Sequence, residues 1–274
     1  MRKWIFPLVA VIAIAVGAYL MVMGHKEAER ARTDAQIAKL EEQANKIKER
    51  RENEAKNESE RDERYDELIA EGQRKRDDGD TSGALDALSQ ALAVAKTNSQ
   101  KYEAFALRAE ALDGNDDERQ KKAGNMMYSL AQGDREMAGA YHVIARAEEK
   151  LGEYMNAMRD YQKAGELYKS AGMDEMAWLD LAAASRVAED GAKSHQSAAR
   201  LWEEAWQMVD EGDMSEEKKN KAYYELCLDR ASMAEHAKKW REQLKWHREA
   251  ARYDPRHEEA ADALEAALKR QRKI

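Results

Sequence analysis

The sequence predicts an all-α protein, and three observations lead to this prediction. Charged residues make up 36% of the 274 residues and only two prolines interrupt the chain, which is typical of helical proteins. Residues 138–171 carry apolar side chains at helical spacing on both sides of Gly152, as two helices joined by a turn would. Alanines alternate with tyrosines there, so two backbones can approach closely. Because a helix pair cannot bury its apolar face alone, we expect copies of this unit stacked into an α-solenoid.

The overall charge argues against one class of partner. The formal net charge is −8, and the lysines and arginines are not gathered into one patch. Nucleic-acid-binding domains concentrate basic residues on one face. We therefore expect no nucleic acid as a partner. The single cysteine, Cys227, excludes an intrachain disulfide, and a lone thiol does not indicate which compartment holds the protein.

An uncharged apolar run follows a short basic start at the N-terminus. Residues 4–23 are long enough to span a bilayer as one helix. The alternative is a signal peptide cleaved near residues 16–18, but the apolar run continues beyond that site, which favours a retained anchor. The predicted transmembrane anchor occupies residues 1–24 and includes Trp4 and Tyr19 near the interfaces and Met23 at its end.

The orientation of this anchor is less constrained. Basic residues lie on both sides of the apolar run, so the positive-inside rule does not fix the topology. A short N-terminal tail usually stays in the cytoplasm, which would place the large C-terminal part across the membrane. We therefore expect a single-pass membrane protein. In a bacterium it would lie in the inner membrane with its C-terminal domain in the periplasm, although the charges do not fix on which side of the membrane that domain lies.

Residues 25–64 form a highly charged segment without glycine or proline. Opposite charges recur at spacings of three and four, which supports a solvated helix. Ile37, Leu40, Ala44 and Ile47 give an apolar seam of less than two heptads, which is short for a coiled coil. We expect a helical stalk. Self-association, or packing against a partner helix through this seam, is the alternative.

Five helix pairs are expected in residues 65–256, followed by a capping helix and basic tail in residues 257–274. Their turns lie at Gly79, at residues 113–116, at Gly152, in the long stretch 188–194, and before Trp240. The last helix has apolar residues on one side and charges on the other, as the open end of a solenoid requires. The residues expected on its buried side are Ala260, Leu264 and Ala267.

The residues of these units resemble those of one family. The order of aromatic or aliphatic residue, small residue, glycine turn and small residue resembles the tetratricopeptide repeat over about residues 65–255, with Pro255 where that family ends a repeat. Units four and five exceed the family period. They also resemble the longer helical hairpins of soluble adaptor proteins of the SNAP type, in residues 163–172 and 197–208.

The resemblance implies where a partner would bind. In tetratricopeptide-repeat proteins, partners lie along the concave face built by the first helix of each unit. The family's Lys/Asn clamp for a C-terminal carboxylate is absent, because Ile69 and Gln73 occupy its positions. Arginines on this face would offer bidentate contacts to a peptide, and the alternative is that they are merely solvated. The residues implied for this groove are Arg76, His142, Arg146, Glu149, Leu179, Arg186, Leu228 and Glu235.

Motifs for catalysis, cofactors and metals were sought in the sequence. It contains no phosphate-binding loop and no His-Glu-x-x-His motif, and its six histidines are dispersed. Cys227 is expected to be a buried, inert thiol. Trp206 and Trp246 lie off the predicted core stripe and are candidates for exposed partner anchors. We therefore expect no catalytic residue, no cofactor and no metal ligand, and hence not an enzyme.

Two functions fit these expectations. The first is a membrane-anchored scaffold or adaptor that binds a protein or peptide through its groove, in the assembly of an envelope complex. The second is a permanent structural subunit of a multiprotein membrane machine, for which the stalk and the convex face would be the contacts.

Overall fold

The computed structural model describes residues 5–271 as backbone, with side chains for residue 39 and residues 42–271. The described residues are helical and contain no strand, so the predicted all-α class is confirmed. The chain divides into two compact units, residues 1–62 and 63–274, which are described separately below.

The first unit belongs to α1 (Ile5–Asp77), one helix in place of the separate anchor, stalk and repeat helices expected from the sequence. Every described side chain from residue 42 to residue 62 is exposed. Lys46 and Glu42 form an ion pair at 2.6 Å, and Lys48–Glu52 and Lys56–Glu60 lie at 3.9 Å, all with the i,i+4 spacing that supports a solvated helix.

The side chains of the predicted anchor lie outside the described part of the chain. Trp4, Tyr19 and Met23 lie outside the residues whose side chains are described. Among the described residues, no helix has both the length and the apolar character needed to cross a bilayer.

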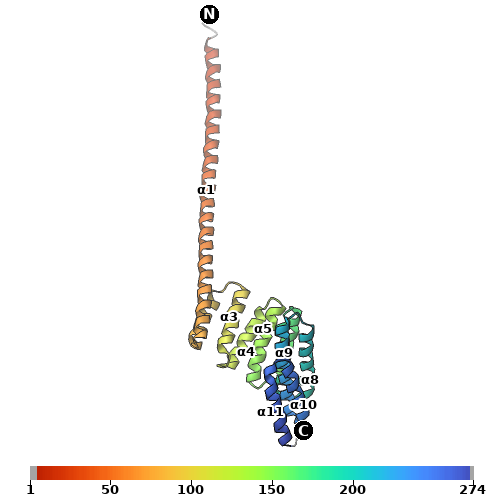
Figure 1. Cartoon of the computed structure of the whole chain (residues 1–274). Coiled ribbons are helices and arrows are strands. Elements are labelled where there is room, and N and C mark those ends of the chain that lie inside the picture. Colours follow the sequence, from red (N-terminus) through yellow and green to blue (C-terminus); the bar gives the residue numbers. More distant parts are fainter. Residues whose placement is uncertain (1–4, 272–274) are drawn as a thin grey trace. The chain divides into compact units, whose positions relative to one another are not determined.

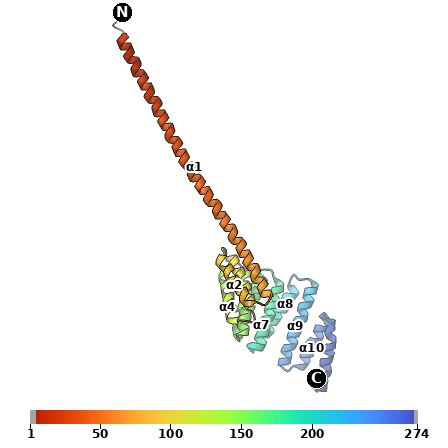
Figure 2. The same cartoon turned by 90° about the vertical axis from the view of Figure 1, so that its left-hand side faces the viewer.

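The second unit starts with the end of α1 and continues through helices joined by short turns. Each helix packs mainly on its neighbours in the chain, an arrangement compatible with a helical solenoid (Figure 1, Figure 2). We call each pair of consecutive helices a helical unit: α1/α2, α3/α4, α5/α6, α7/α8 and α9/α10. The bounds of these helices are α2 (Thr81–Val94), α3 (Asn98–Leu112), α4 (Asp117–Leu130), α5 (Asp134–Lys150), α6 (Tyr154–Ser170), α7 (Asp174–Arg186), α8 (His195–Glu211), α9 (Glu216–His236) and α10 (Trp240–Tyr253).

Helix starts follow local capping chemistry. The Asp80 carboxylate accepts a hydrogen bond from the Gly83 amide at the start of α2. Thr97 and Gln100 form a capping box at the start of α3. Side chains that accept from these otherwise unpaired amides stabilise a helix by about 1 kcal/mol. The predicted turns therefore coincide with real helix boundaries.

The fourth turn differs from the prediction. Residues 188–194 were expected to be an extended turn, but η1 (Val187–Gly191) continues α7 as a π-helix. The break itself is confined to residues 192–194. Gly191 is needed here because a Cβ atom at this position would lie 2.3 Å from the Tyr154 ring. Tyr154 itself, expected in the core, is exposed.

The chain ends with a short 3-10 turn, η2 (Pro255–His257), and with α11 (Glu258–Arg270), which packs on α10. The buried side of α11 is one position away from the predicted one. Ala261 and Leu268 are buried, whereas Ala260 and Ala267 are exposed. Alanines occur on several sides of α11, so its apolar pattern does not define which side is buried.

The core is largest in the later helices. One buried cluster extends from Ala138 to Met233 and includes Tyr161, Trp178 and Trp202. Three smaller clusters lie among α1, α2, α3, α4 and α5. Alanine is frequent in all four, so the helices approach closely and the few aromatic side chains fill the remaining space.

Candidate partner-binding face

The implied groove residues named above lie on four helices, the end of α1 and α5, α7 and α9. The resemblance also places Glu103 and Glu110 of α3 in this groove, so the first helices of all five units contribute to it. We call this surface the odd-helix face. Its charged side chains are tied to neighbouring helices by ion pairs and hydrogen bonds.

The first contact joins the first two units. The Arg76 guanidinium forms an ion pair with the Glu110 carboxylate on α3, 34 residues further along the chain. Arg76 also meets Asp77 at 2.9 Å. Arg76 is therefore oriented by two carboxylates rather than left free in solvent.

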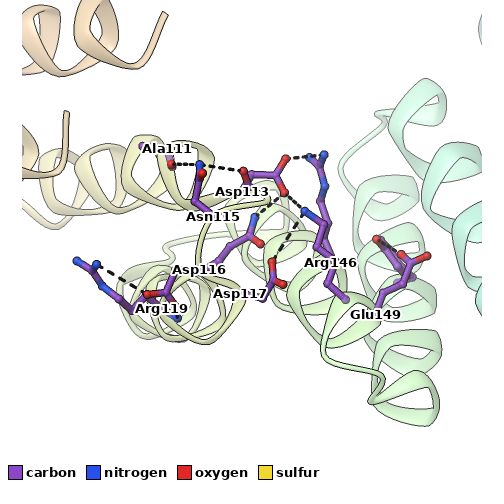
Figure 3. A network of polar contacts seen from close by, with 11 residues as sticks. Ala111, Asp113, Asn115, Asp116, Asp117, Arg119, Arg146 and Glu149 are labelled. Carbon is purple, nitrogen blue, oxygen red and sulfur yellow. Dashed lines mark hydrogen bonds and ion pairs between the residues drawn. The ribbon is translucent and has the colours of Figure 1, made fainter. Parts of the chain in front are cut away.

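Asp113 is a hub between the second and third units (Figure 3). Its carboxylate meets Arg146 at 2.6 Å and Lys150 at 2.5 Å, both on α5, and accepts from Gln120 of α4 at 3.3 Å. Burial alone would raise the pKa of Asp113, but the hydrogen bond from Lys150 and the charge of Arg146 outweigh it, so the pKa is lowered. Asp113 therefore stays ionised and fixes α5 against the end of α3.

The third and fourth units are joined by a buried carboxylate. Asp180 on α7 is only 2% exposed, and its Oδ1 atom lies 2.6 Å from Nδ1 of His142 on α5. Burial raises the pKa of Asp180, against the opposing effect of His142. The His142 ring also meets the Tyr161 ring edge-on, and the Tyr161 hydroxyl donates to Glu149 at 3.0 Å. His142 and Glu149 thus belong to one network.

The fourth and fifth units repeat this pattern. The Arg186 guanidinium donates to the Asp229 carboxylate on α9 at 2.9 Å. Burial raises the pKa of Asp229, and the charge of Arg186 counteracts it. At the far end of α9, Glu235 accepts from Gln243 of α10 at 3.0 Å. The predicted arginines of this face are therefore structural partners of acids.

The separation in sequence between the contacting residues reflects the length of the repeat. Arg76 and Glu110 are 34 residues apart, and so are Tyr102 and Glu136, whose backbone carbonyl accepts from the tyrosine hydroxyl. The separation is 38 residues for His142 with Asp180. It is 43 residues for Arg186 with Asp229. The repeat is regular in the first three units and longer in the last two.

The apolar residues predicted for this face have no such ties. Leu179 is 38% exposed on α7 and Leu228 is half-buried on α9. Next to α9, a cavity of about 710 Å³ is lined by Tyr224, Glu225 and Tyr253, among others. Oriented charges beside exposed apolar side chains and a cavity can hold a peptide, because the charges orient it while the apolar contacts supply affinity.

The tryptophans do not lie where the sequence predicted. Trp206 and Trp246 are half-buried rather than exposed. Their ring centroids lie 5.2 and 5.1 Å from that of buried Trp202, respectively, and the Trp206 ring meets the Tyr223 ring at a tilt of 43°, with centroids 4.6 Å apart. They pack against the core between α8, α9 and α10, so the predicted exposure of these two side chains is wrong.

The described residues also bear on the remaining chemistry. Cys227 is buried, and burial raises the pKa of its thiol to about 12, so the thiolate is scarcely populated at neutral pH. Among the described side chains, those of residue 39 and residues 42–271, no group of three His, Cys, Asp or Glu is arranged to hold a metal ion.

Sequence reasoning missed the acids at the centre of these contacts. Asp113 was assigned only to a turn, and neither Asp180 nor Asp229 was singled out. The sequence pattern that points to these contacts is a basic residue and an acid that lie one repeat length apart on consecutive first helices. In a chain with 46 lysines and arginines and 54 acids, many pairs share that spacing by chance.

Comparison with known proteins adds no relative. No family model matches the chain, and no curated protein matches it. The resemblance to tetratricopeptide repeats therefore stays a prediction from the sequence.

Proposed function

We propose that this protein is a membrane-anchored scaffold of tetratricopeptide-like units that binds a protein or peptide partner on its odd-helix face. The observation that supports this most directly is the series of polar contacts from Arg76 to Asp229, which ties successive first helices together. Ion pairs between units hold the face in one arrangement before a partner arrives, and a preorganised surface loses less entropy on binding. Exposed Leu179 supplies apolar contact area in the middle of this face.

The arginines are poor test positions, because reversing Arg146 or Arg186 would place two carboxylates side by side and disturb the fold. Leu179→Arg is sharper, since this side chain is exposed and its loss leaves no buried group unpaired. Met155→Arg is the matched control, because Met155 is exposed on α6, outside the odd-helix face.

The experiment is purification of the full-length protein in mild detergent with quantitative mass spectrometry of its partners. We expect Leu179→Arg to lose a partner that Met155→Arg retains, with equal helicity by circular dichroism. Equal recovery with both variants would refute binding on the odd-helix face.

The alternative is a permanent subunit of a membrane machine, with the stalk and convex face as contacts. The observation that favours it is the complete exposure of the described side chains of residues 42–62, which leaves a helix surface open to other helices. In that case partners would co-purify at constant ratio and would be lost on replacing this segment with a different charged helix, whereas Leu179→Arg would have no effect.

The anchor and its topology belong to the same proposal. We infer a retained transmembrane segment in residues 1–24, with the C-terminal domain in the periplasm of a bacterial inner membrane. Intact-mass measurement tests retention, and protease protection in spheroplasts tests the side. A mature chain that begins near Tyr19 would contradict the anchor.

A further inference from the structure

A second surface stands out on the opposite side of α3, and it does not depend on the proposed function of the odd-helix face. Residues advance by about 100° each around a helix, so Phe105 and Arg108 lie opposite Glu103 and Glu110, which belong to the predicted groove. Between α3 and α4 is a cavity of about 320 Å³. It is lined by Phe105, Arg108, Arg119, Lys122, Ala123 and Met126.

The six lining residues are cationic or apolar. Three positive charges gather at this cavity in a chain whose formal net charge is −8. Arg119 meets Asp116 at only 3.8 Å, and Arg108 donates to the Ser89 hydroxyl oxygen at 3.4 Å. Burial, and then the nearby charge of Arg119, lower the pKa of the Arg108 guanidinium. An anion placed between the two guanidiniums would relieve this repulsion.

The apolar residues define the rest of the ligand. Met126 is 41% exposed, and Phe105 is half-buried against the core. A flexible methionine beside an aromatic ring accommodates side chains of varied shape. The cavity can hold one large side chain, whereas a free inorganic anion would leave the apolar portion unfilled.

We propose that this cavity binds an acidic peptide segment of a partner protein, with a carboxylate between Arg108 and Arg119 and an adjoining apolar side chain against Phe105 and Met126. Guanidinium groups bind carboxylates through paired hydrogen bonds, which gives orientation as well as affinity. The exposed ammonium of Lys122 adds a less directional attraction at the rim.

The test uses the full-length protein in phosphatidylcholine nanodiscs and a random peptide library. Peptides are selected on the protein alone, and the Arg119→Gln variant is used only to measure the affinity of the enriched peptides. We expect the enriched peptides to share an acidic residue beside an aromatic or aliphatic one. Their affinity should fall at least about tenfold with Arg119→Gln, or with Glu→Gln in the peptide, because each change removes one charged hydrogen-bond partner. Combining both changes should cost little more than either alone.

The controls separate this proposal from its rivals. Arg119 is exposed, so Arg119→Gln should fold normally, and Arg159→Gln removes an exposed arginine of α6 that does not line the cavity. Arg159→Gln should leave the peptide affinity unchanged. Enriched peptides without an acid, or with equal affinity for both variants, would overturn the proposal. The proposal would also be overturned if a variant kept peptide binding and lost only the capture of phosphatidylserine-containing vesicles, because the ligand would then be a lipid surface.

Discussion

In the first three helical units, the turn between the two helices contains a left-handed glycine, whereas in the last two units it contains a left-handed lysine. Gly79, Gly114 and Gly152 adopt left-handed φ values of 79°, 72° and 78°, which cost glycine nothing. At the corresponding turns, Lys193 and Lys238 adopt φ values of 54° and 56°. A side chain in this conformation costs about 1 kcal/mol or more. The last two units therefore tolerate backbone strain that the first three avoid.

The two regions also differ in how their helices are held. The first three units have small buried clusters and the Asp113 ion-pair hub. One large cluster, which contains Trp178 and Trp202, extends through the last two units and also includes residues of the third. The paired residues that tie successive units are 34 residues apart for Arg76 and Glu110 in the first region, and 43 residues apart for Arg186 and Asp229 in the last. We infer that a larger aromatic core offsets the strained turns of the later units, so the two regions should respond differently to mutation.

The largest effect is expected at Trp202. This side chain is 5% exposed, and its indole N–H donates to the Leu226 carbonyl at 2.8 Å. Trp202→Ala should lower the free energy of unfolding by about 3–5 kcal/mol, since it leaves a cavity and removes the hydrogen bond of the indole. Urea denaturation followed by circular dichroism measures this loss.

Hydrogen exchange then tests whether the two regions unfold separately. Repeat stability is approximately a sum over neighbouring units. Trp202→Ala should therefore speed amide exchange in α8, α9 and α10 more than in α2, α3 and α4. A uniform increase over all helices would show one cooperative unit and would remove the distinction between the regions.

The next effect concerns the first region. Asp113→Asn removes the charge that meets Arg146 and Lys150, and should cost about 1–2 kcal/mol. Because the folded pKa of Asp113 is lowered, its contribution is present above the ordinary aspartate pKa near 4 and is lost as the pH falls through the folded pKa. The difference from the parent protein should therefore shrink in acid, in denaturation curves from pH 7 to pH 2. Asp86→Asn, at an exposed position of α2, is the matched control and should be neutral.

How far the sequence predicts this molecule can be judged from such positions. Glycine turns and helical spacing predicted the helix pairs, because a left-handed glycine and an apolar stripe are local signals. The partners of Asp113 were not predictable, since charged residues are abundant and the pairing depends on three-dimensional register. The π-helical continuation at Val187–Gly191 carries no breaking residue until Gly191. Trp206 and Trp246 were misplaced because their rings pack on Trp202, a contact that the apolar stripe of a single helix does not reveal.

A third prediction concerns a carboxylate that the fold destabilises. Burial, followed by the nearby Glu148 carboxylate, raises the pKa of Asp160 to about 6. A carboxyl group whose pKa is raised in the folded state stabilises the fold below its unfolded pKa near 4, and this contribution is lost as the pH rises through 6. Asp160→Asn should therefore stabilise the protein at pH 7, by about 1 kcal/mol after allowing for partial exposure, and have little effect at pH 4. A gain that is equal at both pH values would contradict this assignment.

The smallest effect tests the turns themselves. Lys238→Gly should relieve the left-handed strain but increase the entropy of the unfolded chain, for a net gain of about 0.5 kcal/mol in unfolding free energy. Lys239→Gly is the control, because φ is −93° there and only the entropic cost remains, so this variant should be destabilised. Thermal denaturation of both variants gives the comparison. If Lys238→Gly lost as much stability as Lys239→Gly, the lysine turns would not be strained, and the larger aromatic core would have no turn strain to offset.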